Sequence, residues 1–197
     1  MWAGLILPPC RLKVADGAID GPDGGPYKPR PSSPMIEIRV RTGSMPPSDL
    51  VSPNAIIPAL KVNGKKQALQ EIAAKAAVLT GQSERTILEI LLQREKLGST
   101  GVGNGVAIPH GKLAKLATVF GLFARLERPV DFEALDGQPV DLIFLLLAPE
   151  GAGADHLKAL ARVARLLRDP EVARKLRNSH DADALYAVLA MPSASAA

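Results

Sequence analysis

The sequence contains few of the residues that fix a protein class at first sight. One cysteine, Cys10, occurs among the 197 residues, which excludes a disulfide framework and any zinc site built from several cysteines. No apolar run approaches the roughly 18–20 residues that a membrane-spanning helix needs, so we expect no membrane insertion. Aromatic residues make up only 4% of a chain that is 47% hydrophobic, so the core has to be built from aliphatic side chains.

A strong excess of one charge is also lacking. The 24 lysines and arginines stand against 20 aspartates and glutamates, which gives a formal net charge of +4. Half of this excess lies in residues 1–44. The rest of the chain has no block of like charge, so we expect no nucleic-acid partner.

Residues 1–44 differ in composition from the rest of the chain. Residues 1–47 hold nine of the 17 prolines, and segment 20–31 is too rich in proline and glycine for a helix or a strand ladder. The start lacks the basic region and the long apolar run of a signal peptide, so we expect a cytoplasmic protein. We interpret 1–44 as a disordered extension from an upstream start codon, followed by one domain over 45–191 and a frayed tail over 192–197.

Apolar residues recur at helical spacing in two neighbouring segments. The first pattern predicts a helix over residues 65–80 that ends at Gly81, because glycine readily adopts the left-handed conformation that closes a helix. The second predicts a helix that starts after Ser83, a good N-cap residue, and ends near residues 94–97.

Helical spacing returns near the end of the chain. Asp155 is a candidate N-cap for a helix over residues 156–168, and shorter helices are expected over 171–177 and 183–189. In the first of these we expect the following side chains to point inward: Leu157, Leu160, Val163, Ala164 and Leu167.

Three strands are expected between these helical regions, over residues 106–108, 117–126 and 140–147. The last is almost entirely apolar, which is typical of a central strand that is covered on both faces. Helices before and after a run of strands favour an α/β fold, a single domain built as a three-layer α/β/α sandwich around a mixed sheet.

The stretch between residues 94 and 112 is unusually rich in glycine. It is not a Walker loop, since no Gly-Lys-Ser/Thr follows a four-residue gap, and it lacks the glycine spacing of a dinucleotide-binding turn. Its backbone could approach an anion closely, or it could simply form turns. The residues that could support a bound phosphate are Gly98, Ser99, Thr100, Gly101, Gly103, Asn104 and Gly105.

His110 follows Pro109 and precedes a glycine, at an expected strand-to-loop transition. A free imidazole has a pKa near ~6.5, so most of it is neutral at pH 7 and able to attack phosphorus. His156 begins an expected helix, whose free N–H groups favour an anion, and Arg94 could offer a planar fork to phosphate oxygens. A purely structural role for His110 and a metal site at the two histidines are the alternatives, but no convincing third metal ligand exists. His180 is interpreted as a solvated linker residue.

The segment Arg94-Glu-x-x-Gly-Ser-Thr-Gly-Val-Gly-Asn-Gly-Val-Ala-Ile-Pro-His-Gly-Lys112 is long and specific. Together with Pro139-Val-Asp-Leu-Ile-Phe and Asp155-His-Leu-x-x-Leu, it resembles the IIA proteins of the bacterial phosphoenolpyruvate:sugar phosphotransferase system (PTS), in particular the nitrogen-regulatory type, IIA-Ntr. The similarity runs from about Leu50 to Leu189.

The resemblance implies an α/β/α sandwich and a histidine that accepts phosphate at Nε2 from a phosphorylated HPr-like carrier protein. His110 matches this histidine, His156 the second active-site histidine, and Arg94 the arginine that contacts phosphate. It implies a phosphocarrier rather than a turnover enzyme, with no cofactor and no metal. Regulated targets in such families include transport systems and sensor kinases.

Two other functions compete with a nitrogen-regulatory phosphocarrier. One is a sugar-specific IIA component, of the fructose or mannitol type, that passes phosphate to a IIB domain. The other is a protein-binding module that keeps the fold without the phosphate chemistry, against which the intact His110, His156 and Arg94 argue.

Overall fold

The structure is a computed structural model that describes residues 50–191. The extension expected over 1–44 and the tail expected over 192–197 lie outside the described residues. The elements follow in the order β1 (Val51–Leu60), α1 (Lys65–Thr80), α2 (Glu84–Lys96), β2 (Gly101–Gly103), β3 (Val106–Ala107), β4 (His110–Leu113), β5 (Phe120–Val130), β6 (Val140–Pro149), η2 (Glu150–Ala152), α3 (Gly153–Arg168), α4 (Pro170–Asn178) and α5 (Ala182–Ala190).

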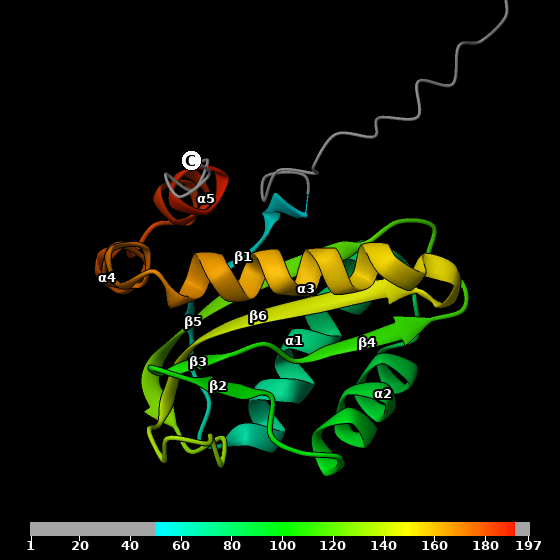
Figure 1. The fold of residues 1–197 in the computed structure, drawn as a ribbon, viewed down its shortest axis with the longest axis horizontal. Helices are drawn as coiled ribbons and strands as arrows, with labels where there is room; N and C mark the ends of the chain where they lie inside the picture. The colour runs from blue at the N-terminus through cyan, green and yellow to red at the C-terminus, as the bar shows by residue number, and fades with distance from the viewer. Residues whose placement is uncertain (1–49, 192–197) are drawn as a thin grey trace, which may run out of the picture. The chain divides into compact units, whose positions relative to one another are not determined.

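The strands form one mixed sheet in the order β1-β5-β6-β3-β2, with β4 also paired to β6 (Figure 1). β6 runs antiparallel to β5 and parallel to both β3 and β4. β1 is parallel to β5, and β2 is antiparallel to β3. The strands β3 and β4 therefore follow one another along the same edge of β6, and the Pro109 carbonyl between them accepts a hydrogen bond from the Leu146 N–H (2.9 Å).

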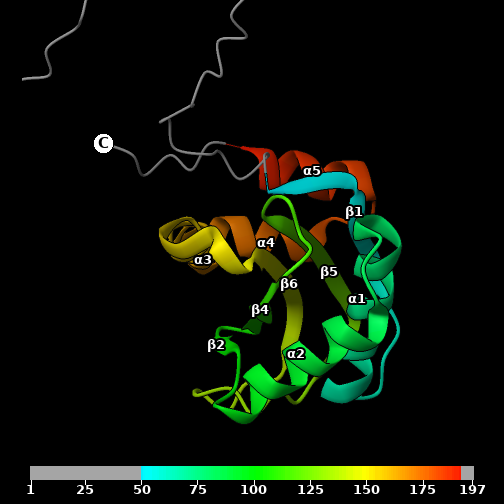
Figure 2. The ribbon, with the colours of Figure 1, turned by 90° about the vertical axis from the view of Figure 1, so that its right-hand side faces the viewer.

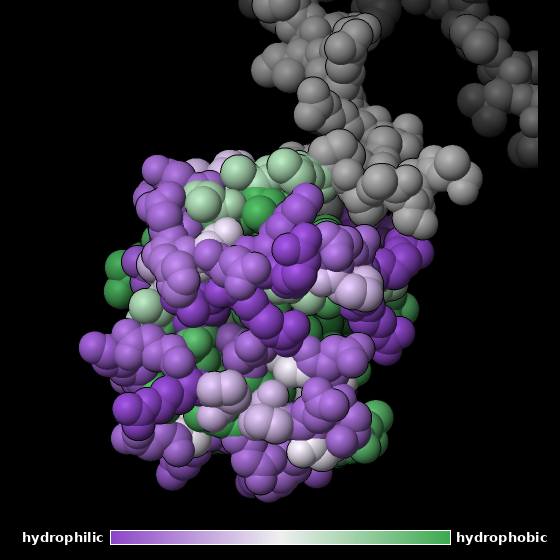
Figure 3. Space-filling view, turned by 90° about the vertical axis from the view of Figure 1, so that its left-hand side faces the viewer, coloured by the Kyte–Doolittle hydropathy of each residue, from purple (hydrophilic) through white to green (hydrophobic). Residues whose placement is uncertain are grey.

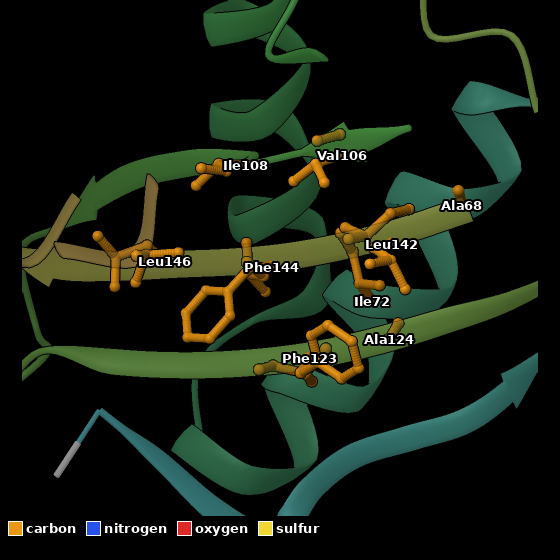
Figure 4. Close-up of a cluster of buried hydrophobic side chains, with 14 of the residues drawn as sticks. Ala68, Ile72, Val106, Ile108, Phe123, Ala124, Leu142, Phe144 and Leu146 are labelled. Carbon is orange, nitrogen blue, oxygen red and sulfur yellow. The ribbon is translucent and has the colours of Figure 1, made fainter. Parts of the chain in front are cut away.

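Helices cover both faces of this sheet. Helices α1 and α2 lie on one side and α3, α4 and α5 on the other, as Figures 1 and 2 show. Residues 142–148 of β6 are all buried, and side chains of β5, β6 and α1 form much of the core shown in Figure 4. The core is mainly aliphatic, as expected, but it includes the rings of Phe123 and Phe144. The predicted three-layer α/β/α sandwich with a mixed sheet and a central apolar strand is thus confirmed.

The first two predicted helices are confirmed, together with the residues that end and start them. α1 covers residues 65–80 and is closed by Gly81, whose φ of 68° is left-handed. Ser83 caps α2, and its hydroxyl accepts a hydrogen bond from the Thr86 N–H at 3.4 Å. The cap fixes where α2 starts, and hence which residues reach its last turn beside the sheet.

The predicted start of α3 is wrong. The helix begins at Gly153, directly after the short 3-10 helix, so Asp155 lies inside its first turn and contacts Lys158 instead of capping the helix. Leu157, expected inside, is 67% exposed, because the buried face of α3 is set by His156, Ala159 and Val163. His156, and not Leu157, therefore lies on the buried face of α3.

Three strands were missed by the sequence analysis. The sequence analysis made no prediction for β1, which contains Pro53 and Pro58. Within the described sheet β1 pairs only with β5 and so lies at an edge, where proline is tolerated. β2 and β4 have only three and four residues, too few to show a period. Among residues 50–191 no helix is long and apolar enough to cross a membrane.

Candidate functional site

His110 is the first residue of β4 and its side chain is half-buried. Its ring nitrogen Nδ1 lies 2.8 Å from the Ile108 carbonyl oxygen, and its Nε2 lies 3.1 Å from Nε of Arg94. A carbonyl oxygen only accepts and a guanidinium N–H only donates, so Nδ1 carries the proton and Nε2 offers its lone pair. The two contacts thus select one neutral tautomer and fix the orientation of the ring.

Arg94 lies in the last turn of α2 and bridges the ring to the turn that follows the helix. Besides the bond from its Nε to His110, its Nη1 donates to the Gly98 carbonyl oxygen at 2.9 Å. Within the part of the chain that the structure describes, no carboxylate lies within salt-bridge distance of this guanidinium. The charge of Arg94 is therefore held in place by neutral groups only.

Close packing of α2 on β4 brings Arg94 to the histidine. A Cβ added at Gly111 would overlap Cγ2 of Ile90, so the helix rests directly on the glycine that follows His110. Ile90 and Arg94 are one helical turn apart on the same face. With Ile90 seated on Gly111, Arg94 comes to lie over the ring of His110.

His156 approaches the same ring from the opposite layer. The two ring centroids are 5.8 Å apart, with an angle of 59° between the planes. His156 is in the first turn of α3, is only 6% exposed, and its buried Nδ1 has no hydrogen-bond partner among the described residues. The N-terminal end of a 16-residue helix, which favours negative charge, thus lies beside His110.

Both histidines are kept neutral by their surroundings. Burial, first of all, lowers the pKa of His110 below its ordinary 6.5, and the charge of Arg94 acts in the same direction. The hydrogen bond to Ile108 and the charge of Glu95 act in the opposite direction without cancelling the shift. Burial, then the charges of His110 and Lys112, lower the pKa of His156 as well.

The structure brings together only some of the residues predicted to support a phosphate. Gly98, Ser99, Thr100 and Gly101 form the turn between α2 and β2, next to Arg94. Gly103, Asn104 and Gly105 form the tip of the β2–β3 hairpin. Gly105 bonds to β6 at residues 141 and 142 whereas His110 pairs with Leu146, so the tip lies about 15 Å farther along the sheet.

A second polar cluster surrounds that hairpin tip. Arg177 of α4 donates from Nε and Nη2 to the carboxylate of Asp141, at 2.7 and 2.9 Å, and from Nη2 to the Asn104 carbonyl oxygen at 2.6 Å. An open hollow of about 340 Å³ lies beside them, lined also by Gly105 and Pro139. This side of the molecule, with α4, presents mainly hydrophilic side chains (Figure 3).

The remaining candidates lie apart from the histidine pair. His180 is exposed, as expected of a linker residue, and its Nδ1 lies 2.9 Å from Nη2 of Arg125. Cys10 is outside the described residues. Over residues 50–191 no three histidine, cysteine, aspartate or glutamate side chains come close enough to hold a metal ion.

The sequence analysis missed Lys65 and Glu95, which form a partly buried ion pair next to Arg94. Lys65 begins α1 and Glu95 lies near the end of α2, so two helices and the turn between them separate the two residues. No local pattern links them, and the pair is recognised only in the fold. Chemically, the site offers a neutral imidazole nitrogen whose lone pair faces Arg94, a guanidinium with no carboxylate within salt-bridge distance among residues 50–191, and a helix N-terminus. These groups suit an electrophile that is itself an anion, such as a phosphoryl group.

One known protein family and several known proteins match most of the chain. The family described as "Phosphoenolpyruvate-dependent sugar phosphotransferase system, EIIA 2" matches residues 49–191. A nitrogen regulatory protein of Bradyrhizobium diazoefficiens is 75% identical over 153 residues, which are 78% of this chain and 100% of that protein.

Two solved structures share the fold. The nitrogen regulatory protein IIA-Ntr from Neisseria meningitidis has a TM-score of 0.69 and 37% identity, and the match covers 72% of this chain and 97% of that one. The mannitol IIA protein of Escherichia coli has a TM-score of 0.61 at 22% identity, over 71% of this chain and 98% of that one, which shows a common fold.

Proposed function

We propose that the chain, which belongs to the EIIA type-2 family of the phosphoenolpyruvate-dependent PTS, is a phosphocarrier that accepts phosphate on His110. Within this family it resembles the nitrogen regulatory proteins. The donor in this proposal is a phosphorylated HPr-like carrier protein, and the site of the reaction is the cytoplasm. The single observation that carries the proposal is the pair of contacts at His110, with Nδ1 against the Ile108 carbonyl oxygen and Nε2 against the guanidinium of Arg94.

The transfer follows from the positions of these atoms. The Nε2 lone pair of His110 forms a bond to phosphorus while the bond between phosphorus and the donor breaks, and that electron pair stays with the donor. The proton on Nδ1 remains in its hydrogen bond to Ile108 and helps the ring to carry positive charge. Arg94 leaves Nε2 and contacts the phosphoryl oxygens, whose charge also faces the N-terminus of α3.

The regulatory output is a change in what binds to this surface. Leu97, 86% exposed, lies three residues after Arg94, and Leu157, 67% exposed, adjoins His156. We propose that these leucines contact partner proteins in an apolar interface around His110. A phosphate dianion placed between them disfavours apolar contact, so partner choice depends on phosphorylation. The partners are the carrier and regulated target proteins, for which a transport system or a sensor kinase is the class we propose.

One experiment tests the chemistry directly. The protein is incubated with phosphoenolpyruvate, the first enzyme of the PTS and an HPr-type carrier, and its intact mass is measured. We expect one added phosphate that is labile in acid, none in His110→Ala, and strongly slowed addition in His156→Ala. His180→Ala is the matched control and should behave as the wild type, because His180 lies outside the site. An acid-stable phosphate, or an unmodified wild type, would refute the proposal.

A further inference from the structure

A partly buried ion pair lies directly beside the site and takes no part in the transfer described above. The carboxylate of Glu95, whose side chain is 6% exposed, lies 3.0 Å from Nζ of Lys65 in α1, whose side chain is 19% exposed. Burying two charges is costly, and a mere tie between α1 and α2 could have been made from apolar side chains. The position of the pair, one residue after Arg94, suggests a use in the site itself.

The pair first holds Thr100. The Thr100 hydroxyl donates to Glu95 at 2.6 Å, and the Thr100 N–H donates to the same carboxylate at 3.1 and 3.2 Å. Thr100 is 3% exposed, so these bonds are shielded from water. With Lys65 they satisfy the carboxylate from several directions and fix the turn at the end of α2.

Two chains of hydrogen bonds then lead from this turn to the two nitrogens of His110. In the first, the Thr100 carbonyl oxygen accepts from the Ile108 N–H at 2.9 Å, and the Ile108 carbonyl faces Nδ1 of the ring. In the second, the Gly98 carbonyl oxygen in the same turn accepts from Nη1 of Arg94, whose Nε donates to Nε2 of the ring. Hydrogen bonds therefore connect both nitrogens of the imidazole to the same turn, which Glu95 holds in place.

We propose that Lys65, Glu95 and Thr100 are positioning residues that hold His110 in its Nδ1-protonated tautomer and hold Arg94 at Nε2. This inference rests on the proposed role of His110. The three residues do not touch the phosphoryl group and act only through the turn. Their contribution is to keep the reacting lone pair and the guanidinium in register before the donor arrives.

The cluster is ionised at neutral pH. Burial acts to raise the pKa of Glu95, but the hydrogen bonds from Thr100 and the contact with Lys65 outweigh it and leave the pKa below its ordinary value. Burial acts to lower the pKa of Lys65, and its bonds to Glu95 and Glu133 outweigh that effect in turn. Removing the charge of Glu95 therefore leaves a partly buried ammonium whose other contacts among the described residues are Glu133 and the Phe132 carbonyl oxygen.

Lys65 offers a matched pair of variants. It contacts the buried Glu95 and also Glu133, at 3.1 Å, whose side chain is 79% exposed. Glu95→Gln and Glu133→Gln make the same chemical change on the two sides of one lysine. Only the first replaces one of the two oxygens that accept from Thr100 by an NH2 group, so Glu133→Gln controls for the loss of an ion pair as such.

The experiment measures the tautomer and the kinetics of the full chain. The protonation of each ring nitrogen of His110 is read from 15N chemical shifts, and phosphorylation is followed against the concentration of the phosphorylated carrier. In Glu95→Gln we expect a mixture of tautomers and a maximal rate about 10- to 100-fold lower, with an unchanged half-saturating carrier concentration. Glu133→Gln should match the wild type in all three. If Glu95→Gln keeps both the tautomer and the rate, the proposal is wrong.

Thr100→Val covers the case in which Glu95→Gln does not fold. Thr100→Val keeps the ion pair and removes one hydroxyl. We expect a smaller shift of the tautomer and a smaller loss of maximal rate than in Glu95→Gln, and wild-type values again in Thr100→Ser. An unchanged tautomer in Thr100→Val would overturn the proposal. The tautomer is measured without phosphate, so this test does not depend on the proposed function. If the wild type takes no phosphate but the variants still change the tautomer, the proposed function is rejected and the positioning role is kept.

Discussion

Two arginines, one at each end of the β2–β3 hairpin region, make opposite kinds of contact. Arg177 makes a paired contact with the carboxylate of Asp141 and closes the hairpin tip through Asn104. Arg94 donates only to an imidazole nitrogen and a carbonyl oxygen, while the adjacent Glu95 gives its carboxylate to Lys65 and Thr100. A permanent counter-ion suits an arginine that stabilises the fold, and neutral partners suit one that has to receive a transient anion.

The largest effect should separate the two arginines in the rate of phosphorylation. Removing one charged donor from a transition state costs about 100-fold or more, so Arg94→Ala should slow phosphorylation by that factor. Arg177→Ala should leave the rate unchanged, because Arg177 lies at the far end of the hairpin. Quantitative mass spectrometry of the time course checks this, and equal rates in the two variants would remove the distinction.

The next largest effect is on the free energy of unfolding, where Arg177→Ala should lose more than Arg94→Ala. Arg177→Ala leaves Asp141 without its paired donors, and we expect a loss of about 1–2 kcal/mol in the free energy of unfolding, reduced by partial exposure. Arg94→Ala should lose less, because its partners are a neutral ring and a carbonyl at the surface of the turn. Urea denaturation followed by circular dichroism measures both, and a larger loss in Arg94→Ala would contradict the comparison.

A methyl group at the hairpin tip tests the contact of Arg177 with Asp141 without substituting either residue. A Cβ at Gly105 would lie 2.6 Å from Nη2 of Arg177 and 2.9 Å from Oδ1 of Asp141, and the φ of +74° disfavours any side chain. Gly105→Ala should therefore lower the free energy of unfolding by about 1–3 kcal/mol and keep the rate of phosphorylation. Gly151→Ala, where nothing lies within 4 Å of the added Cβ, is the control and should change neither.

The smallest effect concerns protonation. The pKa of His110 lies below 6.5, so the ring stays mainly neutral as the pH falls from 7.5 to 6.5, and the rate should decline only at lower pH. Arg94→Ala removes a charge that lowers this pKa, so the pKa should rise toward 6.5, whereas Arg177→Ala should not move it. An NMR titration of His110 measures both, and a fall of the pKa in Arg94→Ala would contradict the assigned contact.

The sequence predicts the parts of the fold that repeat within a single element. The 3.6-residue period and the residues Gly81 and Ser83 locate α1 and α2, and the apolar run locates β6. β1 could not be predicted, because its prolines are compatible with a strand only when that strand is known to lie at an edge of the sheet. The start of α3 was predicted wrongly, because the helix follows directly on a 3-10 helix and begins at Gly153.

The same limit applies to the candidate site. His110 stands out because its neighbours are unusual, and the resemblance to a family indicates Arg94 and His156. The tautomer of His110 and the Lys65–Glu95 pair depend on contacts between separate elements, and no local pattern encodes them. For the same reason Gly103, Asn104 and Gly105 are next to Gly101 in sequence but serve the other end of the hairpin.

The close approach of Ile90 to Gly111 sets the distance between α2 and the strand that begins with His110. One extra carbon atom at residue 111 acts as a spacer between helix and strand. It moves Arg94 away from the ring while every polar group keeps its identity. Such a variant would keep Leu97 and Leu157 for binding a carrier protein but would lack the geometry for accepting its phosphate. The two halves of the proposed role, recognition and transfer, can thus be uncoupled at a position that has no side chain at all.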